Sequence, residues 1–109
     1  MTATGNADFN GITANKYIAL HGNAATSDIT LSGAVVATGT ELTNTNGIEV
    51  SGKDINVNAN VTANAGNIAL TSAGTLTVAT GTAVTAQALN ATITMDAATV
   101  VAEGDLVAA

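Results

Sequence analysis

The feature that most constrains the fold of this chain is an apolar spacing that recurs four times between residues 29 and 106. Each occurrence has an aliphatic residue, a second seven or eight positions later, and a third after thirteen to sixteen positions. The four sets are Ile29, Val36 and Leu42; Ile48, Ile55 and Val61; Ile68, Leu76 and Val84; and Ile93, Val100 and Leu106. A repeat of about twenty residues with three short apolar segments is typical of a stacked β coil.

Local patterns also favour strands and turns. Residues 48–50 and 68–70 read Ile-Glu-Val and Ile-Ala-Leu, which places two aliphatic side chains on one face of a strand. Glycine follows Asn or Ser at residues 32–33, 46–47 and 51–52, and such pairs supply the sharp corners between short strands. Thr, Asn, Val and Gly interrupt every stretch in which Ala would favour a helix.

Equal spacings allow successive turns of the chain to stack in register. We expect Ile29, Ile48, Ile68 and Ile93 to lie above one another in one apolar row, inside a roughly triangular coil whose turns are about 4.8 Å apart. The predicted fold is all-β, a short β-solenoid (β-helix) of about four coils. A small antiparallel β-sandwich is the alternative, because short strands with frequent turns fit that fold as well.

The predicted organisation has two parts. Residues 26–109 form the repeat β domain, and residues 1–25, which break the repeat, form an irregular N-terminal arm or cap. The length of 109 residues leaves room for one domain only. The chain has one Phe, one Tyr and no Trp, so its core suits the narrow lumen of a solenoid better than a wide sandwich.

Charge and cysteine content limit the partners. Charged residues make up 9% of the chain, against about 25% in ordinary soluble domains, which favours an assembled state. The formal net charge is −6, with two basic residues in all, so we expect no nucleic-acid binding and no membrane insertion. The absence of Cys excludes disulfides and thiolate metal sites. Residues 1–20 lack the pattern of a secretory signal.

The two ends of the chain carry the candidate functional residues. A solenoid needs polar caps, because a bare terminal coil exposes its apolar lumen and unpaired backbone groups. The last residues, among them Leu106 and Val107, include no charge after Asp105, so the C-terminal coil is predicted to be uncapped. Both aromatic residues, Phe9 and Tyr17, lie in the N-terminal segment. We predict that these four apolar residues take part in assembly or docking.

Residues that could carry chemistry are few. His21 is the only imidazole, and the sequence shows no partner for it in a triad or zinc site, so a surface role is favoured over a catalytic one. The eight acids are scattered singly without a calcium-loop motif, and we interpret them as turn residues, with calcium binding as the alternative. No catalytic residue, cofactor or metal ligand is predicted.

Two stretches resemble known families. Residues 66–78, Gly-Asn-Ile-Ala-Leu-Thr-Ser-Ala-Gly-Thr-Leu-Thr-Val, look like the repeats of filamentous-haemagglutinin-type adhesins, which are right-handed β-helices on bacterial surfaces. Residues 4–12, Thr-Gly-Asn-Ala-Asp-Phe-Asn-Gly-Ile, are similar to segments of phage fibre and other virion-surface proteins. The first resemblance implies an adhesin that binds a glycan or a host receptor, and the second a structural component of a virion.

The sequence therefore predicts a non-enzymatic structural subunit of a virion surface or fibre, of the capsid-decoration or fibre type. It would act by self-assembly, for which a homotrimer suits a three-faced coil, and by docking on a carrier lattice such as a capsid. The alternative is a β-helical segment of a bacterial surface adhesin. Either protein would be located on a virion surface or outside the cell.

Overall fold

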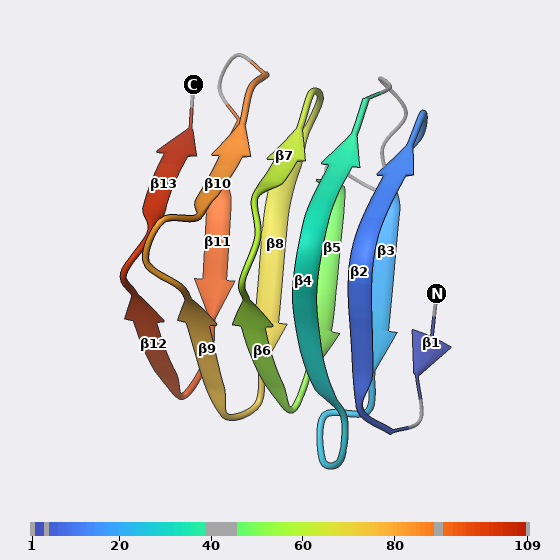
Figure 1. Cartoon of the computed structure of the whole chain (residues 1–109), viewed down its shortest axis with the longest axis vertical. Coiled ribbons are helices and arrows are strands. Elements are labelled where there is room, and N and C mark those ends of the chain that lie inside the picture. The colour runs from blue at the N-terminus through green and yellow to red at the C-terminus, as the bar shows by residue number, and fades with distance from the viewer. Residues whose placement is uncertain (1, 4, 39–45, 89–90, 109) are drawn as a thin grey trace.

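The computed structural model describes residues 2–3, 5–38, 46–88 and 91–108, and in these ranges the chain contains strands, turns and no helix. Every strand pair is parallel, and the strands wind into a β-solenoid of about four turns (Figure 1). The predicted solenoid is confirmed, and the antiparallel sandwich is wrong, because its strands would have to pair in opposite directions.

The strands form two sheets. The five-stranded sheet contains β1 (Thr2–Ala3), β3 (Ile18–Gly22), β5 (Asn46–Gly52), β8 (Asn67–Ser72) and β11 (Ile93–Asp96). The eight-stranded sheet contains β2 (Ala7–Ala14), β4 (Asp28–Ala37), β6 (Asp54–Val57), β7 (Val61–Ala63), β9 (Thr75–Val78), β10 (Ala83–Ala86), β12 (Thr99–Ala102) and β13 (Asp105–Ala108).

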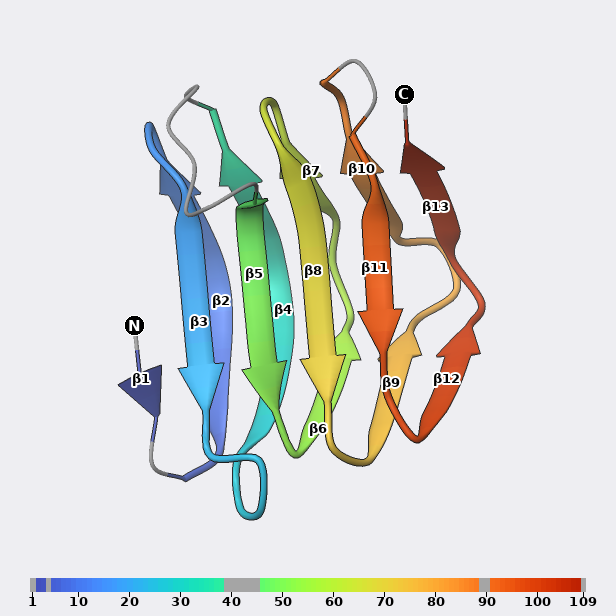
Figure 2. The ribbon, with the colours of Figure 1, turned by 180° about the vertical axis from the view of Figure 1, so that it is seen from behind.

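The coil has two sides rather than the three that we expected. Each turn runs down through the five-stranded sheet and returns up through the eight-stranded sheet, as the views from the front and from behind show (Figures 1 and 2). The returning half consists of two short strands in most turns, but β4 runs through both positions without a break and pairs with β6 and with β7. Because β4 is continuous, the strands β6, β9 and β12 and the strands β7, β10 and β13 belong to one sheet.

Rows of apolar side chains with one member per turn fill the lumen between the sheets, and three of these rows include most residues of the recurring spacing. The first row is Ile18, Ile48, Ile68 and Ile93; the second is Ala7, Ile29, Ile55, Leu76 and Val100; and the third is Ile12, Val35, Val61, Val84 and Leu106. Members in the middle turns, such as Ile55 and Ile68, are fully buried. Stacking of like aliphatic residues gives a continuous column without large aromatic rings.

The predicted position of Ile29 is wrong. Ile48, Ile68 and Ile93 lie in the first row, but Ile29 lies in the second row beside Ile55, and Ile18 occupies the place that we assigned to it. The misplacement arose because residues 23–27 extend the corner between β3 and β4, which shifts the apolar residues of this turn along the sequence. Val36 is also displaced, since its neighbour Val35 pairs with Val61 and is the buried residue of the two. Leu42 lies outside the described residues.

The N-terminal segment belongs to the coil. Residues 1–25 were expected to be irregular, but β2 pairs with β4 along its length, with one register shift after Phe9, and β3 pairs with β5. Ala7 and Ile12 of β2 pack against the core as the first members of their rows. The segment was hard to recognise because Ala7 is smaller than the Ile, Leu or Val at its place in the later turns, and Phe9 is larger than the Leu, Val or Ala at its place. It forms the terminal turn of the stack.

Asn and Asp side chains at the corners join each turn to the next. The Oδ1 atoms of Asn6, Asp54, Asn60 and Asn67 each accept a hydrogen bond from a backbone N–H at or beside the start of a strand in the following turn, at 2.8–3.0 Å. A corner interrupts the backbone ladder of the sheets, so these bonds satisfy donors that would otherwise lack a partner in the protein. This accounts for the Asn and Asp residues at or just before the start of several strands.

Candidate functional site at the ends of the coil

The last turn of the coil exposes aliphatic side chains. Val100 and Leu106 end the second and third rows, yet 42% and 44% of their surfaces are exposed, whereas the members of the same rows two turns earlier are fully buried. Val101 and Val107 lie next to them on the outer face and are 38% and 50% exposed. These four residues, which we call the terminal aliphatic patch, present to solvent the kind of surface that the rest of the chain buries.

The strands at both ends of the stack also have open edges. In the part of the chain that the structure describes, β12 pairs only with β9, β13 only with β10, and β2 only with β4. A parallel strand with one neighbour leaves half of its N–H and C=O groups directed away from the sheet. Such an edge can add a further strand from another molecule or from more of the same chain.

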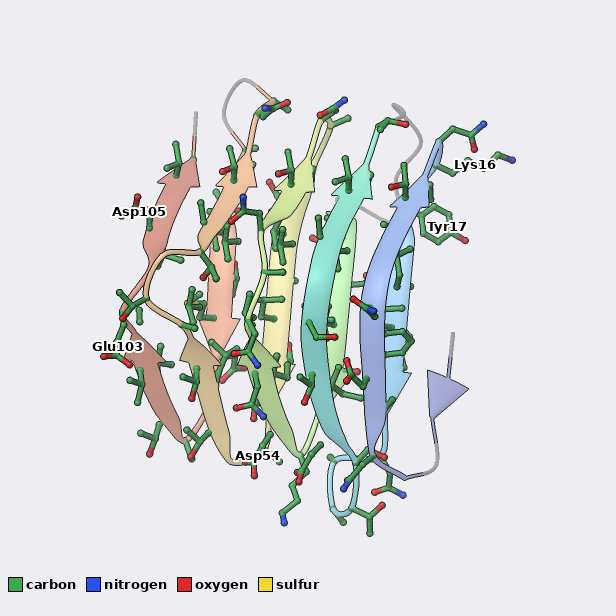
Figure 3. All side chains as sticks on the ribbon, in the orientation of Figure 1. Lys16, Tyr17, Asp54, Glu103 and Asp105 are labelled. Carbon is green, nitrogen blue, oxygen red and sulfur yellow. The ribbon has the colours of Figure 1, made fainter. Side chains whose placement is uncertain are left out.

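The predicted docking residues divide between the two ends. Leu106 and Val107 lie in β13 in the last turn, and Phe9 lies in β2 in the first turn. Phe9 is half-buried and packs against the core, in line with Leu31 of the next turn. Tyr17, just before β3, is 43% exposed (Figure 3). The four residues therefore do not form one site, and the structure does not bring the aromatic and aliphatic pairs together.

The charges at the two ends differ. The last turn carries Asp96, Glu103 and Asp105, and residues 91–108 include no Lys, Arg or His. The first turn carries Asp8 and Lys16, which balance each other. Figure 3 shows Lys16 at one end of the stack and Glu103 and Asp105 at the other. Charge is therefore distributed unevenly along the stack: the last turn is acidic, and the charges of the first turn cancel.

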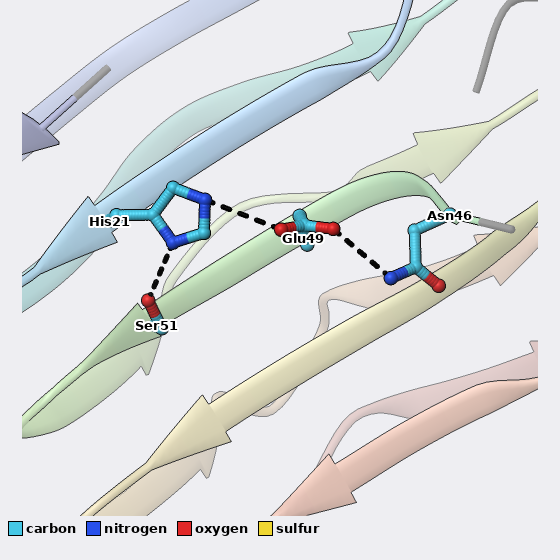
Figure 4. Close-up of polar contacts among 4 residues, drawn as sticks. All are labelled: His21, Asn46, Glu49 and Ser51. Carbon is cyan, nitrogen blue, oxygen red and sulfur yellow. Dashed lines mark hydrogen bonds and ion pairs between the residues drawn. The ribbon is translucent and has the colours of Figure 1, made fainter. Parts of the chain in front are cut away.

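A small polar cluster occupies the outer face of the five-stranded sheet (Figure 4). The Nδ1 atom of His21 lies 2.9 Å from the hydroxyl of Ser51, and its Nε2 atom lies 3.3 Å from a carboxylate oxygen of Glu49. The second carboxylate oxygen of Glu49 accepts a hydrogen bond of 3.1 Å from the side-chain amide of Asn46. The sequence shows no partner of His21 in a triad or zinc site, and the structure adds two polar contacts to its ring from the neighbouring turn.

The pairing register of β3 with β5 explains these contacts, and they could have been predicted if that register had been known. Ile18 pairs with Ile48, so the residues three positions later, His21 and Ser51, must be neighbours on the outer face. The cluster couples β3 to β5, while a triad enzyme would also need oxyanion donors and a cleft for its substrate. No cavity is found among the described residues, and no three of their His, Asp or Glu side chains are grouped closely enough to hold a metal ion.

The geometry places this chain in the class of short parallel β-solenoids with open ends. Comparison with known proteins finds no matching family model, no similar curated protein and no similar solved structure. Within the described ranges, no helix is long and apolar enough to cross a membrane.

Proposed function

We propose that this protein is a non-enzymatic structural subunit of a virion surface or fibre, which acts by self-assembly and by docking on a carrier lattice. The observation that carries the proposal is the terminal aliphatic patch, Val100, Val101, Leu106 and Val107, at the open end of a rigid coil. Exposed aliphatic residues beside unpaired strand edges mark a surface that another protein covers.

The rest of the molecule supports a structural role. Parallel strands with fully buried aliphatic rows form a stiff column, and corner hydrogen bonds from Asn and Asp fix one turn on the next. The outer surface of the eight-stranded sheet is largely Thr and Asn, as at Thr30, Asn56 and Thr77 in one outer row. Such a surface stays hydrated without many charges, as suits a subunit that is held in place by its ends.

A second candidate function is a β-helical segment of a bacterial surface adhesin that binds a glycan or a host receptor. The open edges of the first and last turns favour it, because they would also join this segment to further coils of a longer solenoid. The Thr and Asn side chains along the outer face would then supply hydrogen bonds to the glycan.

Sedimentation across a range of protein concentrations tests self-assembly. We expect the protein to associate as its concentration rises, and Leu106→Glu to shift this association to at least about tenfold higher concentration, since a charge would have to be buried. Asn58→Glu, at the exposed corner between β6 and β7 in the middle turn of the stack, is the matched control and should associate as the parent does. A protein that stays monomeric throughout would contradict the proposal.

Location distinguishes the two candidates. Antibodies against the folded chain should label virus particles from the source material in immunogold electron microscopy if the protein is a virion subunit. Labelling of bacterial surfaces would support the adhesin instead. Label on neither would overturn both.

A further inference from the structure

We infer that copies of this protein stack head to tail, so that β12 and β13 of one copy pair in parallel with β2 of the next copy and the coil continues across the junction. This inference rests on the self-assembly proposed above and specifies its geometry. The occupant of the terminal aliphatic patch is then the first turn of a second copy.

The register of the rows permits this continuation. Within each row the side chains of consecutive turns are direct neighbours, so the junction would place Val100 against Ala7, and Leu106 against Ile12. The inward residues of the last turn, Ala102 and Leu106, are four positions apart, as are Leu31 and Val35 of β4, with which β2 already pairs. β2 already pairs with a partner whose inward residues are four positions apart. The last turn presents the same separation to the free edge of β2 in the next copy.

Side-chain size is complementary across the junction. The inward row that begins with Phe9 continues through Leu31, Val57 and Val78 and ends with Ala102, so its members become smaller towards the last turn. Head-to-tail stacking brings its largest member, Phe9, against its smallest, Ala102. Stacking of two first turns would instead bring two Phe9 rings into the same narrow lumen, which overfills it.

Charge favours the same arrangement. Stacking of two last turns would bring Asp96, Glu103 and Asp105 of one copy near the same three acids of another, and like charges at an interface oppose association. Head-to-tail stacking sets this acidic end against the first turn, where Asp8 and Lys16 balance.

The end face is about as large as one side of a standard protein interface. The backbone extends 33 Å along the strands and 22 Å through the two sheets, and the turns stack along the remaining 26 Å (Figure 1). An end face of 33 by 22 Å has an area on the order of 700 Å², close to the roughly 800 Å² per partner of a standard interface. Because such an interface joins different surfaces and does not close on itself, it generates an open rod.

The absence of cysteine from the chain permits a direct test by cross-linking. Thr13 and Val107 both lie in the outer row that runs through Val36, Thr62 and Thr85, so stacking would make them neighbours. Parallel neighbours about 4.8 Å apart fall within the Cα separations of about 4.4–6.8 Å that a disulfide spans. Both side chains are exposed, so Thr13→Cys and Val107→Cys leave the lumen intact.

The experiment mixes the two single-cysteine variants in equal amounts, one of them labelled with a heavy nitrogen isotope, and analyses the oxidised dimers by mass spectrometry. We expect the mixed dimer to exceed each like dimer by about tenfold, since only the mixed pair meets the geometric limits of a disulfide. The variant with both substitutions should form disulfide-linked chains of increasing length. Thr80→Cys mixed with Val107→Cys is the matched control and should give no such excess.

The outcomes separate this inference from the proposed function. A protein that associates in sedimentation but yields mainly Val107→Cys like dimers would show tail-to-tail pairing and overturn the head-to-tail inference alone. Association with no excess of any dimer would overturn it as well. A protein that remains monomeric overturns the inference together with the proposed self-assembly.

Discussion

Truncation of one residue type at two positions of the same row tests the solenoid core. Ile68 is fully buried in the first row, between Ile48 and Ile93, whereas Ile93 in the last turn is only half-buried. In Ile68→Ala the neighbours on both sides are held by their own strands, so the cavity stays open and we expect a loss of about 3–4 kcal/mol. Such a loss is a large part of the 5–15 kcal/mol typical of a domain.

The matched variant is Ile93→Ala, which removes the same atoms from the open end of the row. Part of its side chain already contacts solvent, and the end turn can relax over the gap, so we expect a loss of about 1–2 kcal/mol. The difference between the variants should therefore be about 2 kcal/mol. It arises from position in the stack and not from residue type.

Urea denaturation followed by far-ultraviolet circular dichroism measures both losses. The measurement is made at a concentration at which sedimentation shows monomers, because a second copy on the last turn would bury Ile93 and enlarge its loss. Equal losses for the two variants, or a larger loss for Ile93→Ala in the monomer, would refute the assignment of the two residues to the middle and the end of one row.

Three further predictions concern the corners and the outer face. Gly47→Ala should cost about 2 kcal/mol or more, because a Cβ atom there would overlap the backbone oxygen of Ala65. Gly5→Ala, whose Cβ atom would meet nothing within 4 Å, should be nearly neutral in the same denaturation assay. Asp54→Ala should cost about 1 kcal/mol by removing the acceptor at its corner, and Asp54→Asn should restore most of the loss because the amide oxygen can accept the same bond; equal losses would argue against the hydrogen bond. A double-mutant cycle on His21 and Glu49 should give a coupling of no more than about 1 kcal/mol, since the pair is exposed, and a larger value would show a stronger interaction than the geometry allows.

The sequence predicted the kind of fold better than its register. The recurring offsets after Ile48, Ile68 and Ile93 identified three consecutive turns, because those turns have corners of similar length. The turn that contains Ile29 has a longer corner before it, and its adjacent valines, Val35 and Val36, cannot be assigned to inside and outside without knowing their partner strand. Pairing between turns decides which residue is buried, and periodicity along one strand does not contain that information.

The sequence predicted only part of the candidate site. The apolar residues near the C-terminus are visible in the sequence, and Leu106 and Val107 are exposed in the structure. The contact of His21 with residues from the next turn depends on a register that begins at Ile18, in the segment that we expected to be irregular. The error in the N-terminal segment therefore also concealed the partners of the histidine.

The winding of the chain makes the length of this particle adjustable. Because each turn rests chiefly on the turns before and after it, a tandem copy of residues 48–67 could be inserted as one additional layer. The layer would extend the column by about 4.8 Å while the faces at its two extremities kept their shape and chemistry. Gene duplication within the repeat could thus produce a graded series of spacers, all compatible with the same attachment points.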